Sequence, residues 1–306
     1  MFQLYKKRDF NALINDTFLF LRAQGKNYFA NYFLINGGLM LVLLLLTFLL
    51  GSIFFEGLFS GLGTPQGQRM LSAYFDSNTG LFVGTAITIA LLAILLSLIS
   101  VSFPVVYLDL LANGQQPTAG LIINGLKARA GRMVVFALAS LITFLPIGVI
   151  FGIISTLLII VLIGIPIGIL VFSAITCCMM LVLYDNLSSE RTFFKAFETG
   201  LKMVFSNFWV HIGKTAIFLV MYFAIQLAFA LLSSFISTFI YYITGSLEET
   251  GFGIITLAFF LVSAAVNYFF GSIFMLAHGM IYYSCRDLRE NKSTYSEIDS
   301  IGNYSE

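Results

Sequence analysis

The longest stretch without charge is the feature that most limits how this chain can fold. From residue 133 to residue 184 the sequence contains no Asp, Glu, Lys or Arg. A helix needs about 20 apolar residues to cross a hydrocarbon core, so this stretch is long enough for two crossings. Other apolar runs, such as "GLMLVLLLLTFLL", do not alternate polar and apolar residues, which argues against a transmembrane β-barrel.

Composition excludes an ordinary soluble domain. Hydrophobic residues make up 59% of the 306 residues and charged residues only 10%, whereas soluble domains contain about 45–50% apolar and about 25% charged residues. We therefore predict an all-α, polytopic membrane protein with six transmembrane helices. The helices are expected near residues 29–55, 81–108, 133–154, 157–184, 212–243 and 253–285, with the third and fourth joined by a turn near "GIIST".

The positions of Lys and Arg predict the orientation. Of the 16 Lys and Arg residues, all except Arg69 lie at the two ends of the chain or in the second and fourth segments that connect the predicted helices. They are Lys6, Lys7, Arg8, Arg22, Lys26, Lys127, Arg129, Arg132, Arg191, Lys195, Lys202, Lys214, Arg286, Arg289 and Lys292. Because cytoplasmic loops accumulate Lys and Arg, both termini are predicted to be cytoplasmic. The predicted location is the bacterial inner (plasma) membrane, crossed several times.

The fourth connection has the pattern of an amphipathic helix. At helical spacing, one face carries Phe194, Phe197, Leu201, Val204 and Phe208, and the other carries Lys195, Glu198, Lys202 and Ser206. Such a helix lies at the boundary between headgroups and acyl chains. Trp209 follows it, at the depth that amphipathic rings favour.

Similar segments precede the first and third helices, which suggests internal repeats. Gly-Leu-Lys recurs at Gly125 and Gly200, and each second helix ends with a Tyr shortly before an Asp. We interpret the chain as three hairpins, each preceded by a cytoplasmic amphipathic helix. The repeats would cover 9–112, 117–188 and 190–288 of a single domain at 1–290, followed by a disordered cytoplasmic tail at 291–306. The alternative is that cytoplasmic loops of membrane proteins share this look without being repeats.

The segment from Glu190 to Trp209 carries a resemblance to a known family. Its pattern, Glu-Arg, Ala-Phe, Gly-Leu and Asn-Phe-Trp leading into an apolar helix, resembles the six-helix bacterial membrane domain found beside some glycerophosphodiester phosphodiesterases, and stand-alone relatives of that domain. The resemblance implies a membrane module without known chemistry of its own. It provides no catalytic residue for this chain.

Four residues within the predicted helices could form a polar site. Asn267 and His278 share a face of the last helix, where they would either handle a proton or ligand or join a packing seam by hydrogen bonds. Pro146 and Pro166 each begin a Pro-Ile-Gly triplet. Interrupted helices in matching positions mark substrate sites in some transporters, but both prolines could equally be simple kinks.

Other polar groups do not suggest chemistry. No carboxylate or cation lies deep in a predicted helix, and His211 is expected to be solvated at the inner boundary. The three cysteines are interpreted as small buried hydrophobes. Nucleotide-binding glycine motifs are absent from the sequence. We therefore predict a protein without a catalytic, cofactor or metal site, which is not an enzyme.

These observations predict an accessory or scaffold protein of the membrane. It would bind lipid or a membrane-protein partner, and no nucleic acid. The residues expected to anchor it are Phe194, Phe197, Leu201, Phe208 and Trp209, with Lys195 and Lys202 contacting anionic headgroups. The alternative is a transporter or channel for a small solute or lipid, using the Pro-broken third and fourth helices together with Asn267 and His278.

Overall fold

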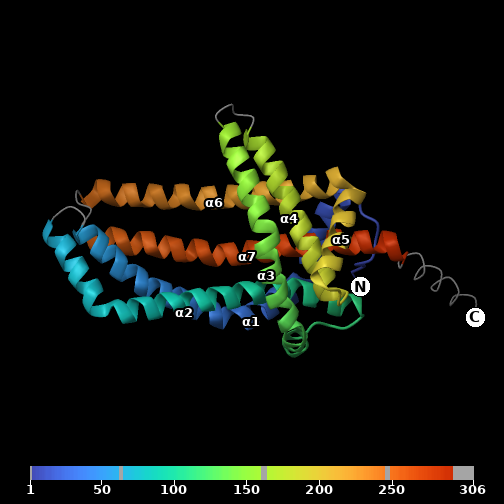
Figure 1. Cartoon of the computed structure of the whole chain (residues 1–306), viewed down its shortest axis with the longest axis horizontal. Helices are drawn as coiled ribbons and strands as arrows, with labels where there is room; N and C mark the ends of the chain where they lie inside the picture. The colour runs from blue at the N-terminus through green and yellow to red at the C-terminus, as the bar shows by residue number, and fades with distance from the viewer. Residues whose placement is uncertain (1, 62–64, 160–163, 245–248, 292–306) are drawn as a thin grey trace, which may run out of the picture. The chain divides into compact units, whose positions relative to one another are not determined.

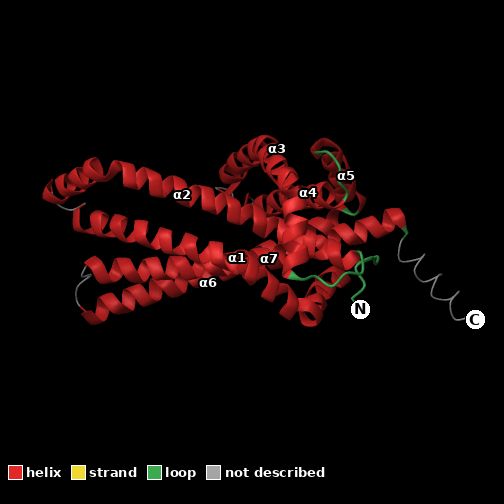
Figure 2. Cartoon of the chain, turned by 90° about the horizontal axis from the view of Figure 1, so that it is seen from below, coloured by secondary structure: helices red, strands yellow, loops and turns green. Residues whose placement is uncertain are grey.

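The computed structural model describes a chain that is almost entirely helical, with short loops before α1 and between helices (Figures 1 and 2). The description covers all residues except 1, 62–64, 160–163, 245–248 and 292–306. The helices are α1 (Phe10–Gly61), α2 (Pro65–Ala112), α3 (Ala119–Ile159), α4 (Gly164–Ser188), α5 (Phe193–Ser206), α6 (Phe208–Thr244) and α7 (Glu249–Glu290). The predicted tail at 291–306 lies outside the described residues, apart from Asn291.

Six of these helices are long and apolar enough to cross a membrane. The candidate spans are Phe10–Gly51, Ser77–Ala112, Ala119–Leu157, Gly164–Ser188, Phe208–Ile236 and Leu257–Glu290. No strand occurs in the described part of the chain. The predicted all-α, polytopic membrane fold with six transmembrane helices is therefore confirmed. This outcome follows from lipid itself, because backbone polar groups in hydrocarbon must be hydrogen-bonded within the segment that carries them.

Helix boundaries differ from the prediction in two places. The segments expected as separate surface helices before residues 29 and 133 are the first turns of α1 and α3, and only α5 is a helix of its own. Neither junction contains a proline, so nothing forces the helix to stop. The turn expected near residues 152–156 is also wrong, because α3 continues to Ile159; these residues have low helix propensity, and tertiary or membrane context outweighs it.

Contacts divide the chain into two compact units. Unit 1 comprises Met1–Ile35, Leu98–Met221 and Gly271–Glu306, and unit 2 comprises Asn36–Ser97 and Tyr222–Phe270. The single domain predicted for 1–290 stays a prediction. Within unit 1, α3 and α4 lie side by side and α5 packs on α4 (Figure 1).

The core of unit 1 is rich in tyrosine. Tyr28, Tyr32 and Tyr107 are fully buried around Phe103, with ring centroids 4.9–5.9 Å apart. A buried tyrosine also needs a partner for its hydroxyl. The Tyr28 hydroxyl lies 2.8 Å from Ser272 Oγ, which links α1 to α7 inside this unit.

Ion pairs and close glycine contacts fix the helix ends of unit 1. Arg129 Nη2 lies 2.5 Å from Asp109 Oδ2, and Arg191 Nη1 lies 3.1 Å from Asp185 Oδ2. A Cβ on Gly125 would lie 2.6 Å from Val106 Cγ1, and a Cβ on Gly200 would lie 2.6 Å from Val182 Cγ2. Both glycines therefore allow one helix to approach its neighbour closely.

Unit 2 consists of long stretches of α1, α2, α6 and α7 with many exposed apolar side chains. Leu41, Leu45, Leu49, Leu91 and Leu231 are all more than half exposed. Soluble proteins rarely expose contiguous apolar surface on this scale, whereas a lipid-facing helix does so by necessity. Where helices approach closely, a small residue is used, since a Cβ on Gly51 would lie 2.8 Å from Leu257 Cδ1.

Candidate functional site

One face of α5 packs against the protein. Phe193, Ala196, Gly200 and Met203 are buried, and Gly200 lies against Val182 of α4. Arg191, just before the helix, reaches both Asp185 and Thr199, with its Nη1 3.0 Å from the Thr199 hydroxyl. The packing and the ion pair together hold α5 in a defined orientation on α4.

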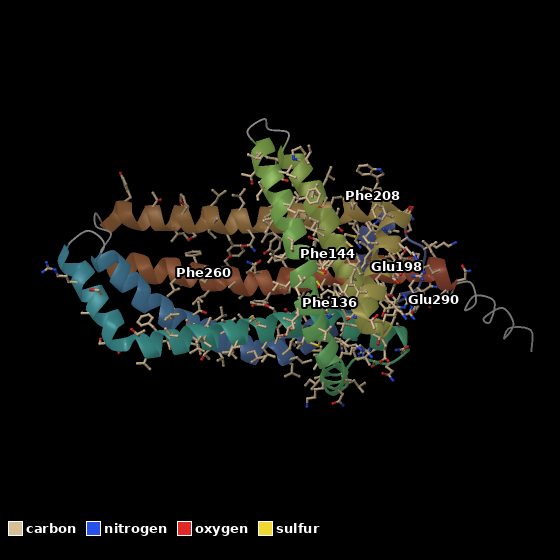
Figure 3. The ribbon with its side chains drawn as sticks, viewed as in Figure 1. Phe136, Phe144, Glu198, Phe208, Phe260 and Glu290 are labelled. Atoms are coloured by element: carbon tan, nitrogen blue, oxygen red, sulfur yellow. The ribbon has the colours of Figure 1, made fainter. Side chains whose placement is uncertain are left out.

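An aromatic edge borders this packed face. We use the term aromatic edge for Phe194 and Phe205 of α5 together with Phe208 and Trp209 at the start of α6. Phe194, Phe205 and Trp209 are 80%, 67% and 72% exposed, and the Phe205 and Phe208 rings stack with centroids 5.6 Å apart. Phe208, labelled in Figure 3, is half-buried and meets Trp209 edge to face at 5.2 Å.

The other two predicted anchors lie further in. Phe197 is half-buried, and its ring centroid lies 5.8 Å from that of Phe144 on α3, a residue labelled in Figure 3. Leu201 is also half-buried and packs against the core of unit 1. Phe205, which was not among the predicted anchors, is more exposed than either. The spacing of Phe194, Phe205 and Trp209 in the sequence could have indicated this edge.

Charged residues cover the remaining face of α5. Lys195, Glu198 and Lys202 are exposed, and Lys202 Nζ lies 2.5 Å from Glu198 Oε1. The hydrogen bond from Lys202 lowers the pKa of the Glu198 carboxyl. Since Glu198 offsets part of the Lys202 charge, Lys195 is the cation on this face with no partner among the described residues.

Asn267 belongs to a polar ladder between α6 and α7 in unit 2. The Tyr222 hydroxyl donates a hydrogen bond to Asn267 Oδ1. One helical turn away, the Ser263 hydroxyl donates to Gln226 Oε1 at 3.1 Å. Hydrogen bonds of this kind hold transmembrane helices together, so the amide oxygen of Asn267 is engaged in packing.

His278 is fully enclosed within unit 1 and is 1% exposed. Its Nε2 lies 3.1 Å from the Thr215 hydroxyl, and its Nδ1 lies 2.8 Å from the Phe274 carbonyl. Both ring nitrogens therefore have partners within the protein. The side chain links α6 to α7 and does not face an open path.

Neither proline breaks its helix within the described residues. The helical stretch of α3 continues through Pro146 from Ala119 to Ile159. Pro166 is the third residue of α4 as described, and the first turn of a helix tolerates proline because its N–H groups lack helical partners. Both residues are exposed. The prediction of a Pro-broken third helix is therefore wrong. Residues 160–163, just before α4, lie outside the described part, so an interruption of the fourth helix stays a prediction.

A buried lysine was missed by reasoning from the sequence. Lys214 was expected among the cytoplasmic cations, but it lies inside α6 and is 1% exposed. Its Nζ donates to the Ala277 carbonyl at 2.6 Å and lies 5.7 Å from the Phe218 ring centroid. An ammonium group is rarely buried without an acidic partner. The spacing of His211, Lys214 and Thr215 on one helical face was the available signal.

His211 is also buried, so its expected solvation is wrong. It is 4% exposed, and its Nε2 lies 3.5 Å from Cys285 Sγ on α7. Its Nδ1 has no hydrogen-bond partner in the described structure. Cys177 and Cys178 are buried free thiols, like Cys285. Among the described residues, no group of three or more His, Cys, Asp or Glu side chains is placed to hold a metal.

Comparison with models of protein families, with curated proteins and with solved structures finds no match to this chain. The resemblance of the segment Glu190–Trp209 to the phosphodiesterase-associated membrane domain therefore stays a prediction. The function is therefore inferred from the sequence and the geometry, of which the aromatic edge of α5 and α6 is the most distinctive exposed part.

Proposed function

We propose that this integral membrane protein is a non-enzymatic accessory or scaffold protein that attaches to lipid through α5. The observation that carries the proposal is the aromatic edge, of which Phe194, Phe205 and Trp209 stay exposed although one face of α5 is packed on α4. We further propose that the protein resides in the bacterial inner membrane with both termini in the cytoplasm. The distribution of Lys and Arg supports this orientation.

Membrane attachment suits the chemistry of this surface. Complete burial of one large apolar side chain is worth about 1.5–3 kcal/mol, so an edge of several aromatic rings provides substantial binding energy. Each cation near an anionic membrane surface adds about 1 kcal/mol. Lys195 supplies this contribution fully and Lys202 only in part, because Lys202 is paired with Glu198.

The scaffold part of the proposal rests on how α5 is held. A surface helix that only anchored the chain in lipid would need few contacts with the other helices. In contrast, α5 packs closely on α4, with Gly200 against Val182 and Arg191 paired with Asp185. Because α5 is held rigidly on unit 1, binding of α5 to the membrane surface would fix the position of unit 1 relative to that surface. Asn267 and His278 both contribute to helix packing, and no observation favours transport through them.

The test uses Trp209 as a built-in reporter, because it is the only tryptophan of the chain. The full-length protein is placed in nanodiscs whose lipids carry bromine at defined acyl positions. We expect shallow brominated lipids to quench the Trp209 fluorescence and aqueous acrylamide to quench it weakly. Strong acrylamide quenching with no effect of any brominated lipid would refute the attachment.

Charge variants then separate lipid attachment from folding. Lys195→Glu should reduce the quenching advantage of anionic over zwitterionic lipids, whereas Lys195→Arg should preserve it. Both substitutions lie on an exposed side chain, so the thermal stability of the protein should remain unchanged. If Lys195→Glu has no effect on lipid preference, anionic headgroups are not recognised by this face.

A further inference from the structure

Unit 1 contains a cavity of about 660 Å³ at the end of α2. Its walls come from the N-terminal segment, α1, α2 and the turn before α3. Cavities of about 300–1,000 Å³ with a few convergent polar groups are typical small-molecule sites. The cavity lies on other helices than the aromatic edge of α5, so a ligand bound here does not depend on the proposed lipid attachment.

Four carboxamide side chains line this cavity. Gln3, Gln24, Asn27 and Gln116 contribute them, and no lining residue is charged. A carboxamide both donates and accepts hydrogen bonds, which matches hydroxyl groups better than ions. Phe2 and Leu111 add an apolar surface to the same wall.

Hydrogen bonds within the protein hold the Asn27 side chain in a fixed orientation before any ligand binds. Its Oδ1 accepts a hydrogen bond from the Tyr107 hydroxyl at 2.8 Å and another from Asn31 Nδ2 at 3.1 Å. Because both contacts engage the oxygen, the amide nitrogen of Asn27 is left to donate toward another group. A donor held by buried neighbours binds a ligand with less loss of side-chain entropy.

The N-terminal wall is tied to the rest of the unit. The buried Arg8 guanidinium donates to the Gln3 carbonyl at 2.8 Å and to the Leu4 carbonyl at 2.7 Å, and it pairs with Asp16 at 2.7 Å. The Phe2 ring meets Phe20 edge to face at 5.3 Å. These contacts make residues 2–4 a fixed part of the cavity.

Cations of α1 point elsewhere. Arg22 and Lys26 are exposed, and each lies about 160° around the helix from Gln24. The neighbouring charges of α1 therefore do not supply an anion site at this cavity. Arg8 has its charge engaged by Asp16 and by backbone carbonyls.

We propose that this cavity binds an uncharged, hydroxyl-rich group, such as a sugar or polyol, between its carboxamides and the apolar wall of Phe2 and Leu111. The carboxamides bind hydroxyl groups, and the apolar wall receives the C–H face of the ring. Two sources provide such a group, a free solute and the headgroup of a neutral glycolipid. The recognition chemistry is the same for both.

The test measures binding to the full-length protein in a detergent without a sugar headgroup. Methyl β-glucoside and myo-inositol serve as free probes in saturation-transfer NMR and calorimetry, and glucosyl-diacylglycerol serves as the lipid probe in native mass spectrometry. We expect saturable binding of at least one probe. Gln116→Leu and Asn27→Leu should each weaken it about tenfold or more, whereas Gln115→Leu, an exposed neighbour that does not line the cavity, should leave it unchanged.

The outcomes distinguish the two sources. Binding of the free probes identifies a solute site, and binding of glucosyl-diacylglycerol but not diacylglycerol identifies a headgroup site. Either result supports the proposal. It is overturned if no probe binds saturably, if Gln115→Leu weakens binding as much as Gln116→Leu, or if anionic phosphatidylglycerol binds in preference to the neutral glycolipid. Because Gln116 is an exposed loop residue, its substitution should not prevent folding.

Discussion

The close contact between Gly125 and Val106 makes a sharp prediction about stability. An added Cβ at residue 125 would lie 2.6 Å from Val106 Cγ1, whereas carbon atoms in contact normally lie about 3.5–4.0 Å apart. Val106 is fully buried and has little room to move. Overpacking of this kind costs about 1–3 kcal/mol, so we expect Gly125→Ala to lower the free energy of unfolding by that amount.

A double-mutant cycle tests the cause. Val106→Ala removes the atom that clashes and leaves the Val106 Cβ in place, 3.9 Å from where a Cβ at residue 125 would lie. The two substitutions should therefore compensate each other, with a coupling energy of about 1–2 kcal/mol. At Gly200 the same rescue by Val182→Ala should be weaker, because the backbone nitrogen of Val182 lies only 3.1 Å away.

The assay is unfolding of the purified protein by sodium dodecyl sulfate titrated into mixed micelles. Gly131→Ala, on the same helix with nothing within 4 Å of its Cβ, is the matched control. It should be neutral or stabilise the protein by up to about 1 kcal/mol, because alanine favours helix over glycine. The reasoning is refuted if Gly125→Ala is as harmless as Gly131→Ala, or if the Gly125 and Val106 effects are simply additive.

Three further predictions concern buried polar groups. Among the described residues, a backbone carbonyl is the one acceptor for the Lys214 ammonium. Lys214→Met should therefore leave thermal stability unchanged or raise it, while Lys214→Glu should prevent folding. Equal losses in both variants would contradict this. Asp16→Asn should lower the free energy of unfolding by about 3 kcal/mol, because the buried Arg8 loses the carboxylate paired with it. The same detergent titration measures this loss. Tyr222→Phe and Asn267→Leu should each cost about 1 kcal/mol and the double variant little more, since they remove one shared hydrogen bond.

The six spans could be predicted from the sequence because hydropathy alone decides them. A run of apolar residues in lipid has few alternatives to a helix, so the candidate spans lie where the uncharged stretches lie. Helix ends were harder to predict. Most cations assigned to loops belong to helices that extend past the apolar stretch, such as Arg129 in α3 and Arg286 in α7.

The buried polar groups could not be predicted because they depend on which helices meet. Lys214 and His211 lie near the start of α6, where the sequence is consistent with solvent, and their burial follows from packing against α7. Similarly, the α5 face chosen from the sequence included Phe197, whose ring meets Phe144 of α3. An apolar helix face can be buried either in lipid or against a neighbouring helix, and the spacing of apolar residues in the sequence is the same in both cases.

Two of the three hairpins end in the same pattern of contacts, while the prediction of three repeats stays a prediction. Val106 precedes Asp109 by three residues, and Val182 precedes Asp185 by three. In both cases a glycine of a later helix packs on the valine, and an arginine pairs with the aspartate. The last hairpin has Ser284 and Asp287 at the same spacing but is followed by no further helix in the described chain.

Its partner is instead the beginning of the chain. Ser284 Oγ accepts a hydrogen bond from the Arg8 backbone N–H at 3.0 Å. Arg8 differs from Arg129 and Arg191, because its side chain is paired with Asp16 and its contact with the last hairpin is made through its backbone N–H. The segment before α1 therefore packs on the end of the last hairpin, where no further helix follows in the described chain.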